Sequence, residues 1–232
     1  MIKFERKKLI IDFLKEKGIS YNEVLSEKLN IPMSTLRRDL NELLKEGLIN
    51  KMHGGVEYND SSLVMEDFFE SKLNNNVDEK ILIAKKAIKL IKKNESIFID
   101  SGSNGFYVCK FLPKDLNLKI VTNSVYNVLE LMKQGHQKVY LLGGKFKPVT
   151  GAIIGYEAIQ SIANYSFDKA FIGINAIDDQ FNLYTTNSEH AQVKIEIIKC
   201  SKQTYGLADS SKFNKKSFYL FAREDKVNLI RK

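Results

Sequence analysis

Two adjacent arginines, Arg37 and Arg38, are the residues of this chain whose type and spacing point most directly to chemistry. Each guanidinium is a planar fork that can bind guanine O6 and N7, or a phosphate, through two hydrogen bonds. Ser34 and Thr35 lie just before them and can donate hydrogen bonds to phosphates, although Ser34 can equally cap a helix. An isolated arginine pair is more commonly a solvated pair with a counter-ion, here Asp39, so the surrounding elements must decide between these alternatives.

Three short helices are predicted in the first fifty residues. Residues 4–17 carry apolar side chains at helical spacing. Ser20 and Glu23 match a capping box, which predicts that a second helix starts there and ends before Pro32. Pro32 suits the start of a third helix, in which leucines recur at three- and four-residue steps, namely Leu36, Leu40, Leu43 and Leu44. The tight turn between the last two helices indicates a helix-turn-helix unit, with the two arginines in the first half of its last helix.

A β-hairpin is predicted directly after this unit. Beyond Gly47, residues 48–58 can fold back at the two glycines that follow His53 and form a wing. Lys51 and His53 would lie on this wing, where both can contact the DNA backbone, although His53 can also be a turn residue without a role. The winged-helix context favours DNA binding by the two arginines over the solvated-pair alternative.

The chain divides into two predicted domains. Residues 1–58 form the winged helix-turn-helix domain, and residues 78–232 form a larger effector domain. Residues 59–77 contain runs of Asp, Ser and Asn with few core-forming repeats, which indicates a linker. Two phenylalanines in this linker, Phe68 and Phe69, are expected to dock on one of the domains.

The larger domain is predicted to be an α/β fold. From residue 96 onward, fully apolar runs alternate with helix-length segments, which is typical of a parallel sheet covered by helices on both faces. The expected strand runs are residues 97–99, 120–121, 139–142, 170–174, 204–208 and 218–221. Ligands of such sheets bind beyond the carboxyl ends of the strands, so the residues that follow each run are candidates for a binding site.

Polar and glycine-containing segments follow several of these runs. Residues 100–104 form a short loop that opens a helix and can aim backbone N–H groups and hydroxyls at an anion, although a plain turn is an equal alternative. Residues 122–124 end the next strand, and Asn123 or Ser124 can be no more than a helix cap. The candidates at these strand ends are Asp100, Ser101, Gly102, Ser103, Asn104, Thr122, Asn123, Ser124, Gly143 and Gly144.

Two further charged candidates lie in the last third of the chain. Glu189 follows Thr186 at the spacing of a capping box, which is the plain structural explanation for both residues. Lys212 lies after the fifth strand run, and its compact ammonium suits a phosphate.

Charge and composition narrow the class of protein without choosing a partner. The 232 residues are 44% hydrophobic and carry a formal net charge of +8, which favours an anionic partner. Residues 1–58 hold 11 Lys or Arg against 9 Asp or Glu, so a DNA surface must come from local placement of charge. Cys109 and Cys200 lack metal-ligand spacing, which predicts free thiols in a reducing cytoplasm and no metal site. No apolar run is long enough to span a bilayer, and the start of the chain lacks the apolar core of a signal peptide.

The motifs together resemble the DeoR family of bacterial transcriptional regulators. The family signature stands here as Thr35-Leu36-Arg37-Arg38-Asp39-Leu40, Gly47, Lys51 and His53-Gly54-Gly55. The chain departs from the signature at Pro32, where the family usually has a capping serine, and at Lys51, where arginine is usual. The match is specific, and the resemblance extends through nearly the whole chain.

The resemblance also implies a ligand and roles for several residues. In the family, a loop of the type Asp-x-Gly-Thr/Ser-Thr, here residues 100–104, helps to bind a sugar phosphate, and this chain has Asn104-Gly105 where threonines are common. The resemblance makes Glu189 a pocket carboxylate for sugar hydroxyls, with Lys194 nearby, and Lys212 lies in the family's Asp-x-Ser-Lys-Phe element. The family's C-terminal domain is similar to ribose-5-phosphate isomerase.

The sequence therefore predicts a sequence-specific DNA-binding regulator, a repressor of a sugar-metabolism operon whose operator affinity a phosphorylated sugar modulates. It is expected to act in the cytoplasm as a homodimer or higher oligomer, because one recognition helix buries too little surface for strong selectivity. No cofactor and no catalytic residue are expected.

Two alternatives belong to other classes of protein. In a sugar-phosphate isomerase-like enzyme, Asp100, Glu189 and Lys212 would move protons on a bound sugar. An isomerase needs no winged helix, however, and a shared fold does not imply retained catalysis. A DNA-binding protein without a ligand would leave the polar loops at the strand ends unexplained.

Overall fold

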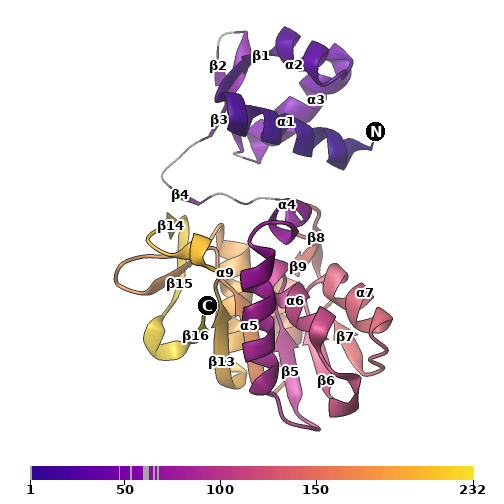
Figure 1. Ribbon diagram of the computed structural model, residues 1–232, viewed down its shortest axis with the longest axis vertical. Coiled ribbons are helices and arrows are strands. Elements are labelled where there is room, and N and C mark those ends of the chain that lie inside the picture. The colour runs from indigo at the N-terminus through magenta and orange to yellow at the C-terminus, as the bar shows by residue number, and fades with distance from the viewer. Residues whose placement is uncertain (1, 47, 53, 60–62, 65, 67) are drawn as a thin grey trace. The chain divides into compact units, whose positions relative to one another are not determined.

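The computed structural model describes residues 2–46, 48–52, 54–59, 63–64, 66 and 68–232, and the chain divides into two compact units (Figure 1). The first unit is Met1–Ser61 and the second is Ser62–Lys232. Gly47, which precedes the predicted wing, and His53 of that wing lie outside the described residues. None of the described helices is long and apolar enough to cross a membrane.

The first unit has the predicted winged helix-turn-helix architecture (Figure 1). Its helices are α1 (Lys3–Lys17), α2 (Asn22–Lys28) and α3 (Met33–Lys45), and its strands are β1 (Ile19–Tyr21), β2 (Ile49–Met52) and β3 (Gly55–Tyr58). β2 and β3 form the predicted hairpin, and β1 adds antiparallel to β3, so the sheet order is β1-β3-β2. The three helices fully bury Ile10 and Leu14 of α1, Leu25 of α2, and Leu36 and Leu43 of α3.

The start of α2 differs from the prediction, whereas the start of α3 agrees with it. The prediction that Ser20 caps the second helix is wrong, because Ser20 lies in β1, where it pairs with Val56, and Tyr21 is the residue that precedes α2. A strand of three residues is too short to show an alternating pattern, so β1 could not be predicted from the sequence. Pro32 immediately precedes α3, as predicted, and its carbonyl accepts a hydrogen bond from Leu36 N at 2.9 Å.

The second unit is built around a parallel sheet with the strand order β16-β13-β10-β5-β6-β7. The strands are β5 (Ser96–Ile99), β6 (Lys119–Thr122), β7 (Val139–Leu141), β10 (Phe167–Gly173), β13 (Ser201–Leu207) and β16 (Asn228–Ile230). Neighbouring residues of β5 face different layers, since Ile97 and Ile99 pack in one core cluster and Phe98 packs in the other. The predicted parallel sheet with apolar residues on both faces is confirmed.

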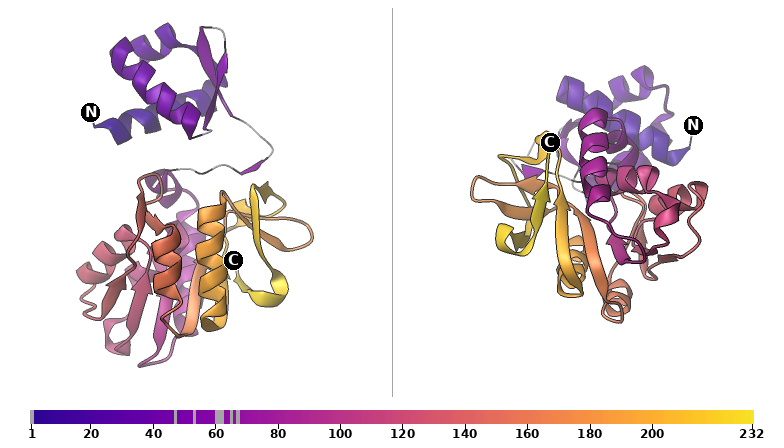
Figure 2. Two further views of the ribbon diagram at one scale, coloured as in Figure 1. Left: turned by 180° about the vertical axis from the view of Figure 1, so that it is seen from behind. Right: turned by 60° about the horizontal axis from the view of Figure 1, so that its bottom comes forward.

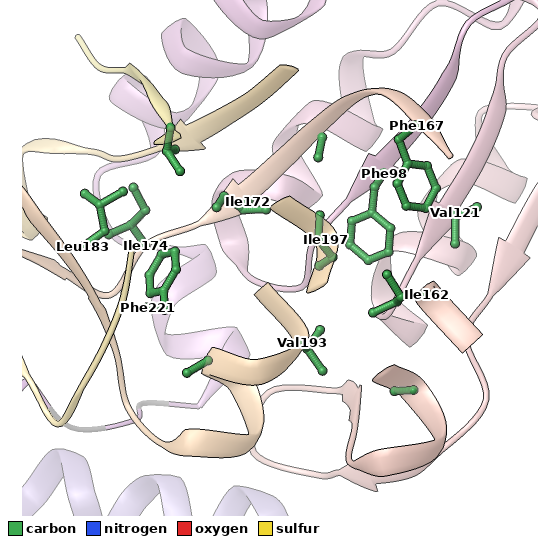
Figure 3. Packing of buried hydrophobic residues seen from close by; sticks show 14 of the residues in the cluster. Phe98, Val121, Ile162, Phe167, Ile172, Ile174, Leu183, Val193, Ile197 and Phe221 are labelled. Atoms are coloured by element: carbon green, nitrogen blue, oxygen red, sulfur yellow. The ribbon is translucent and has the colours of Figure 1, made fainter. Parts of the chain in front are cut away.

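Helices cover both faces of this sheet (Figure 1 and Figure 2). On one face lie α5 (Val77–Lys89), α6 (Ser103–Phe111) and α7 (Val125–Lys133), and on the other lie α8 (Tyr156–Ile162) and α9 (Ser188–Lys199). Figure 3 shows the second interface, which contains Phe98 and Phe167 of the sheet, Ile162 of α8 and Ile197 of α9. Such a layered sheet leaves the carboxyl ends of its strands open to ligands.

Among the described residues, short strands form small sheets beside the main one. β11 (Ala176–Ile177), β12 (Asn182–Thr185) and β15 (Tyr219–Arg223) form one, β8 (Lys145–Lys147) pairs with β9 (Ala152–Ile154), and β4 (Leu63–Val64) pairs with β14 (Lys216–Ser217). The 3-10 helices are η1 (Lys114–Leu116), η2 (Ser210–Lys212) and η3 (Glu224–Lys226).

The apolar run at residues 218–221 does not belong to the parallel sheet, contrary to the prediction. It overlaps β15, which pairs antiparallel with β12. Phe221 is buried and Leu220 is exposed, as on a strand that is covered on one side only. The edge strand of the parallel sheet is instead β16, which pairs with β13.

Most of the predicted linker belongs to the second unit. β4 and α4 (Phe69–Leu73) both lie within residues 59–77, and the last of these residues begins α5. Phe68 and Phe69 are buried, and the Phe69 ring stacks on Tyr126 at a centroid distance of 4.1 Å. The two phenylalanines therefore dock on the second unit.

Candidate functional site

Arg37 and Arg38 are exposed on α3, and neither forms an ion pair with a described residue. Their neighbour Asp39 is fully buried and accepts two hydrogen bonds from Arg6 of α1, one from Nε at 2.7 Å and one from Nη2 at 3.2 Å. Two parallel bonds of this kind fix geometry as well as charge. Asp39 therefore holds α3 on α1, and it is not the counter-ion of the arginine pair.

A hollow separates α3 from the wing within the first unit. Its lining includes Arg37, Asn41, Lys51, Met52 and Gly54. Ser34 is exposed and Thr35 half-buried on the first turn of α3, and Lys51 is exposed on β2. Ser34 lies inside the helix and does not cap it, because Pro32 takes the N-cap position. Arg37 of α3 and Lys51 of the wing thus line one concave surface, and two cations in such a hollow suit a nucleic-acid backbone.

A pocket in the second unit lies where the loops that follow β5 and β10 meet. It brings together six of the residues predicted from the sequence, namely Ser101, Gly102, Ser103, Asn104, Lys194 and Lys212. The other lining residues are Glu66, Phe69, Lys72, Thr150, Gly173, Ile174, Asn175, Thr185 and His190. Residues from distant parts of the chain therefore converge at the carboxyl ends of the strands, where parallel sheets bind ligands.

Asp100 and Lys194 form a buried ion pair beside this pocket. Asp100 Oδ2 also accepts a hydrogen bond from Gly173 N at 3.0 Å, so one carboxylate ties β5 to β10 and α9. Charges buried this deeply need both a counter-charge and hydrogen bonds to offset the loss of water. The Asp100 carboxylate positions Lys194 and the loop after β5, and it is not a free base.

The residues after β6 support the pocket loop from behind. Asn123 Oδ1 accepts a hydrogen bond from Ser101 N at 2.9 Å, and Thr122 Oγ1 donates to the backbone at the end of β5 at 2.6 Å. Ser124 Oγ accepts from Asn127 N at 3.3 Å, which makes Ser124 the N-cap of α7. All three predicted ligand residues are buried and none is among the described lining residues, so they position the loop.

Three further predicted ligand residues lie away from the pocket lining. Gly143 and Gly144 lie in the turn between β7 and β8. Glu189 is half-buried, and its Oε1 lies 3.1 Å from the exposed Lys145 ammonium in an ion pair. The structure therefore does not bring Glu189 together with Lys212.

The N-terminus of α6 carries an acceptor without a partner. Asn104, in the first turn, donates from Nδ2 to Asp209 Oδ2 at 3.2 Å, while its buried Oδ1 has no partner among the described residues.

Two glycines shape the backbone around the start of α6. Gly102 precedes the helix with a φ of +114°, a backbone conformation that residues with a side chain rarely adopt. An added Cβ at Gly105 would lie 2.4 Å from Asp100 O, so the departure from threonine at this position allows α6 to pack closely on the loop.

Asp209 keeps a negative charge next to Lys212. Burial alone would raise the pKa of Asp209, but the Lys212 ammonium and hydrogen bonds from Ser211, Asn104 and Asn76 hold that pKa at about 2. The carboxylate is therefore ionised at neutral pH and places a negative charge beside the Lys212 side chain.

Glu66 is a pocket residue that no sequence motif indicates. Its carboxylate forms an ion pair with Lys147 and lies 3.0 Å from His190 Nε2. Thr186 Oγ1 donates to Glu66 Oε1 at 2.9 Å and does not cap α9, whose N-cap is Asn187. Burial would raise the pKa of Glu66, but His190 and Lys147 hold it well below its ordinary value. An ionised carboxylate thus lines the pocket from within the predicted linker.

Comparisons with protein families match both units of the chain. A family model described as "DeoR-like helix-turn-helix domain" matches residues 6–62. A second model, described as "DeoR C terminal sensor domain", matches residues 75–231.

Individual proteins are similar over nearly the whole chain. The uncharacterized HTH-type transcriptional regulator FruR of Bacillus subtilis is 34% identical over 222 residues, which are 96% of this chain and 88% of that protein. The lactose phosphotransferase system repressor of Staphylococcus epidermidis is 31% identical over 235 residues, which are 99% of this chain and 92% of that protein. Among solved structures, ribose 5-phosphate isomerase A of Methanocaldococcus jannaschii has a TM-score of 0.42 and 20% identity, over 60% of this chain and 55% of that chain.

Proposed function

Since this chain belongs to the DeoR family of transcriptional regulators, we propose that it represses a sugar-metabolism operon and that a phosphorylated sugar sets its affinity for operator DNA. The observation that carries the proposal is the meeting of Ser101, Ser103 and Lys212 at the N-terminus of α6, in one pocket of the sensor domain. The similarity to a lactose phosphotransferase system repressor supports sugar as the class of effector and repression as the outcome.

In this proposal, the exposed first half of α3 recognises the operator. Arg37 and Arg38 form no ion pair with a described residue, so their guanidinium forks are available to guanine edges or phosphates. Ser34 and Thr35 donate to phosphates from the first turn of the helix. On the wing, Lys51 contacts the DNA backbone, and the same role is proposed for His53.

The phosphate group of the effector binds at the N-terminus of α6. Backbone N–H groups at the start of a helix have no intrahelical partner and carry partial positive charge. Ser101 and Ser103 add hydroxyl donors, and Lys212 adds an ammonium. A sugar hydroxyl donates to Asn104 Oδ1, which supplies the partner that this buried acceptor lacks among the described residues.

The enzyme alternative has little support at this site. The family consists of transcription regulators, and a general base must reach its substrate with a free lone pair. Asp100 is held by Lys194 and by Gly173 N, and Glu189 is paired with Lys145 away from the pocket lining. We therefore assign no catalytic residue to this chain.

The active form in this proposal is a cytoplasmic homodimer or higher oligomer. A single recognition helix buries too little surface for strong selectivity, so paired half-sites about one helical turn apart are needed. Sedimentation of the free protein together with footprinting on operator DNA tests this. Two protected half-sites are expected, and a monomer that protects one short half-site contradicts the proposal.

Operator capture followed by effector titration tests the function as a whole. Genomic fragments retained by the purified protein are sequenced, and affinity for the recovered operator is measured with ribose 5-phosphate, glucose 6-phosphate, fructose 6-phosphate and fructose 1-phosphate. One sugar phosphate is expected to change operator affinity by about 5- to 150-fold, while its free sugar has no effect. Constant operator affinity across the panel contradicts the sensor role, and conversion of a sugar phosphate into its isomer supports the enzyme alternative.

A further inference from the structure

Glu66 connects the effector pocket with the segment that leads to the DNA-binding unit. The first unit ends at Ser61, and Glu66 follows shortly afterwards as part of the second unit. Directly downstream, Phe68 and Phe69 are buried and Phe69 N donates to Val149 O at 3.0 Å. The chain is therefore fixed to the second unit on the C-terminal side of Glu66.

The Glu66 carboxylate has capacity for further hydrogen bonds. Oε1 accepts from Thr186 and lies beside His190, and Oε2 pairs with Lys147. An ionised carboxylate offers about four lone-pair sites, so acceptor sites remain. His190 Nε2 is buried 3.0 Å from Glu66 Oε1, but it forms no hydrogen bond of regular geometry with a described residue. A hydroxyl group, which both donates and accepts, suits this pair of side chains.

The charges that line the pocket define two different positions for a ligand. Lys212 and the N-terminus of α6 attract an anion. The ionised Glu66 carboxylate repels an anion and accepts hydrogen bonds from neutral hydroxyls. A sugar phosphate carries both kinds of group on one molecule, and it satisfies both positions when its phosphate lies at α6 and its hydroxyls lie at Glu66.

We propose that Glu66 binds hydroxyls of the effector sugar and thereby couples effector binding to the segment that leads to the DNA-binding unit. The inference rests on the proposed function, because it takes the effector to be a phosphorylated sugar. A ligand in contact with Glu66 stabilises the position in which this side chain contacts Thr186 and Lys147 of the second unit. Linkage then requires that any operator complex that favours or disfavours this position responds to the effector. Glu66 takes the role that the family resemblance gave to Glu189.

The test compares Glu66→Gln with Glu189→Gln in the full-length protein. Both changes replace a carboxylate by an amide of the same size, but Glu189 pairs with Lys145 and is not among the described lining residues. Binding of the four sugar phosphates and of inorganic phosphate is measured by titration and thermal shift. Operator affinity is measured with and without the sugar phosphate that the wild-type protein binds most tightly.

Glu66→Gln is expected to bind that sugar phosphate at least about tenfold more weakly, the factor that corresponds to one hydrogen bond to a charged acceptor. Its affinity for inorganic phosphate stays at the wild-type value, because the phosphate position is separate. Its operator affinity no longer responds to the sugar phosphate. Glu189→Gln matches the wild-type protein in all three measurements.

Lys147→Gln separates ligand binding by Glu66 from a purely structural role. This change removes the ion-pair partner of Glu66 and leaves the carboxylate in place. The expected sugar-phosphate affinity stays within about threefold of wild type, the range for a partly exposed ion pair. If Lys147→Gln loses the operator response as fully as Glu66→Gln does, Glu66 acts only through its ion pair and the proposal is overturned.

The remaining outcomes distinguish the inference from the proposed function. Wild-type sugar-phosphate affinity and operator response in folded Glu66→Gln overturn the inference and leave the proposed function intact. A wild-type protein that binds no sugar phosphate of the panel overturns both. Should Glu66→Gln fail to fold, Glu66→Asp keeps the charge on a shorter side chain, and unchanged sugar-phosphate binding by that variant overturns the inference.

Discussion

The face of α3 that we propose to bind DNA and the proposed effector pocket both contain cations, and two of these settings are opposite. Arg37 and Arg38 are exposed and form no ion pair with a described residue. Lys194, in the pocket lining, is buried and paired with Asp100. An exposed cation keeps its hydrogen-bonding capacity for a partner molecule, whereas a buried and paired cation has already used it within the fold. We therefore expect burial and pairing to distinguish cations that bind a partner from cations that hold the structure.

Lys194→Met is expected to have the largest effect on this comparison. The change leaves Asp100 buried without its counter-charge, so the free energy of unfolding should fall by about 3–5 kcal/mol. Urea denaturation followed by circular dichroism measures it. Lys199→Met, an exposed lysine on the same helix, should change the free energy by less than about 0.5 kcal/mol. Equal stability of the two variants would remove the distinction between structural and binding cations.

Lys212→Met tests the binding cation of the pocket. A sugar phosphate at 100 times its dissociation constant should stabilise the wild-type protein by about 2.7 kcal/mol, and the free sugar should give little shift. Loss of the Lys212 ammonium should remove most of this stabilisation in a thermal-shift titration. The shift is measured from the variant's own ligand-free melting temperature, which should fall because Asp209 loses its counter-charge. Lys216→Met, an exposed lysine on β14, is the matched control. A full shift in Lys212→Met would place the phosphate elsewhere.

Arg37→Ala and Arg38→Ala test the exposed side of the comparison. Each is expected to weaken operator binding by about 1–3 kcal/mol if the arginine contacts a base, or to reduce the salt dependence of binding if it contacts phosphate. The free energy of unfolding should stay within about 0.5 kcal/mol, since neither side chain forms an ion pair with a described residue. Binding isotherms at several salt concentrations provide the measurement, and Lys45→Ala, exposed at the end of α3, is the control. Unchanged affinity and salt slope in the double variant would refute the recognition role.

The two regions also differ in how far the sequence predicts them. The DNA-binding face is formed by one helix, and the spacing of its leucines determines which side is buried, so the exposed residues follow directly. Leu36, Leu40 and Leu43 are buried as that spacing requires, and Arg37 and Arg38 are exposed between them. The local pattern does not predict contacts between distant residues, such as the ion pair of Asp39 with Arg6 of α1.

The pocket is only partly predictable because distant segments assemble it. The rule that ligands bind at strand ends finds residues 101–104, since the topology alone brings the loops together. It cannot separate side chains that line the pocket from those that support it, such as Thr122 and Asn123. Glu66 follows no strand of the parallel sheet, and the docking of the phenylalanines just after it is what brings it to the pocket.

The smallest expected effect is the pH dependence that Asp209 contributes beside Lys212. Its pKa is held at about 2, against an ordinary value of 3.8, although burial acts in the opposite direction. Since the pKa is lower in the folded state, ionised Asp209 stabilises the fold above about pH 4, and this contribution is lost as the pH falls from about 4 to about 2. Denaturation of wild type and Asp209→Asn from pH 6 to pH 3 should show their difference in unfolding free energy shrinking by about 1 kcal/mol. Asp225→Asn, a change at an exposed carboxylate, is the control. If the Asp209→Asn difference stays constant over this pH range, Asp209 does not hold its charge against Lys212, and the argument that places Lys212 at the phosphate position loses its electrostatic support.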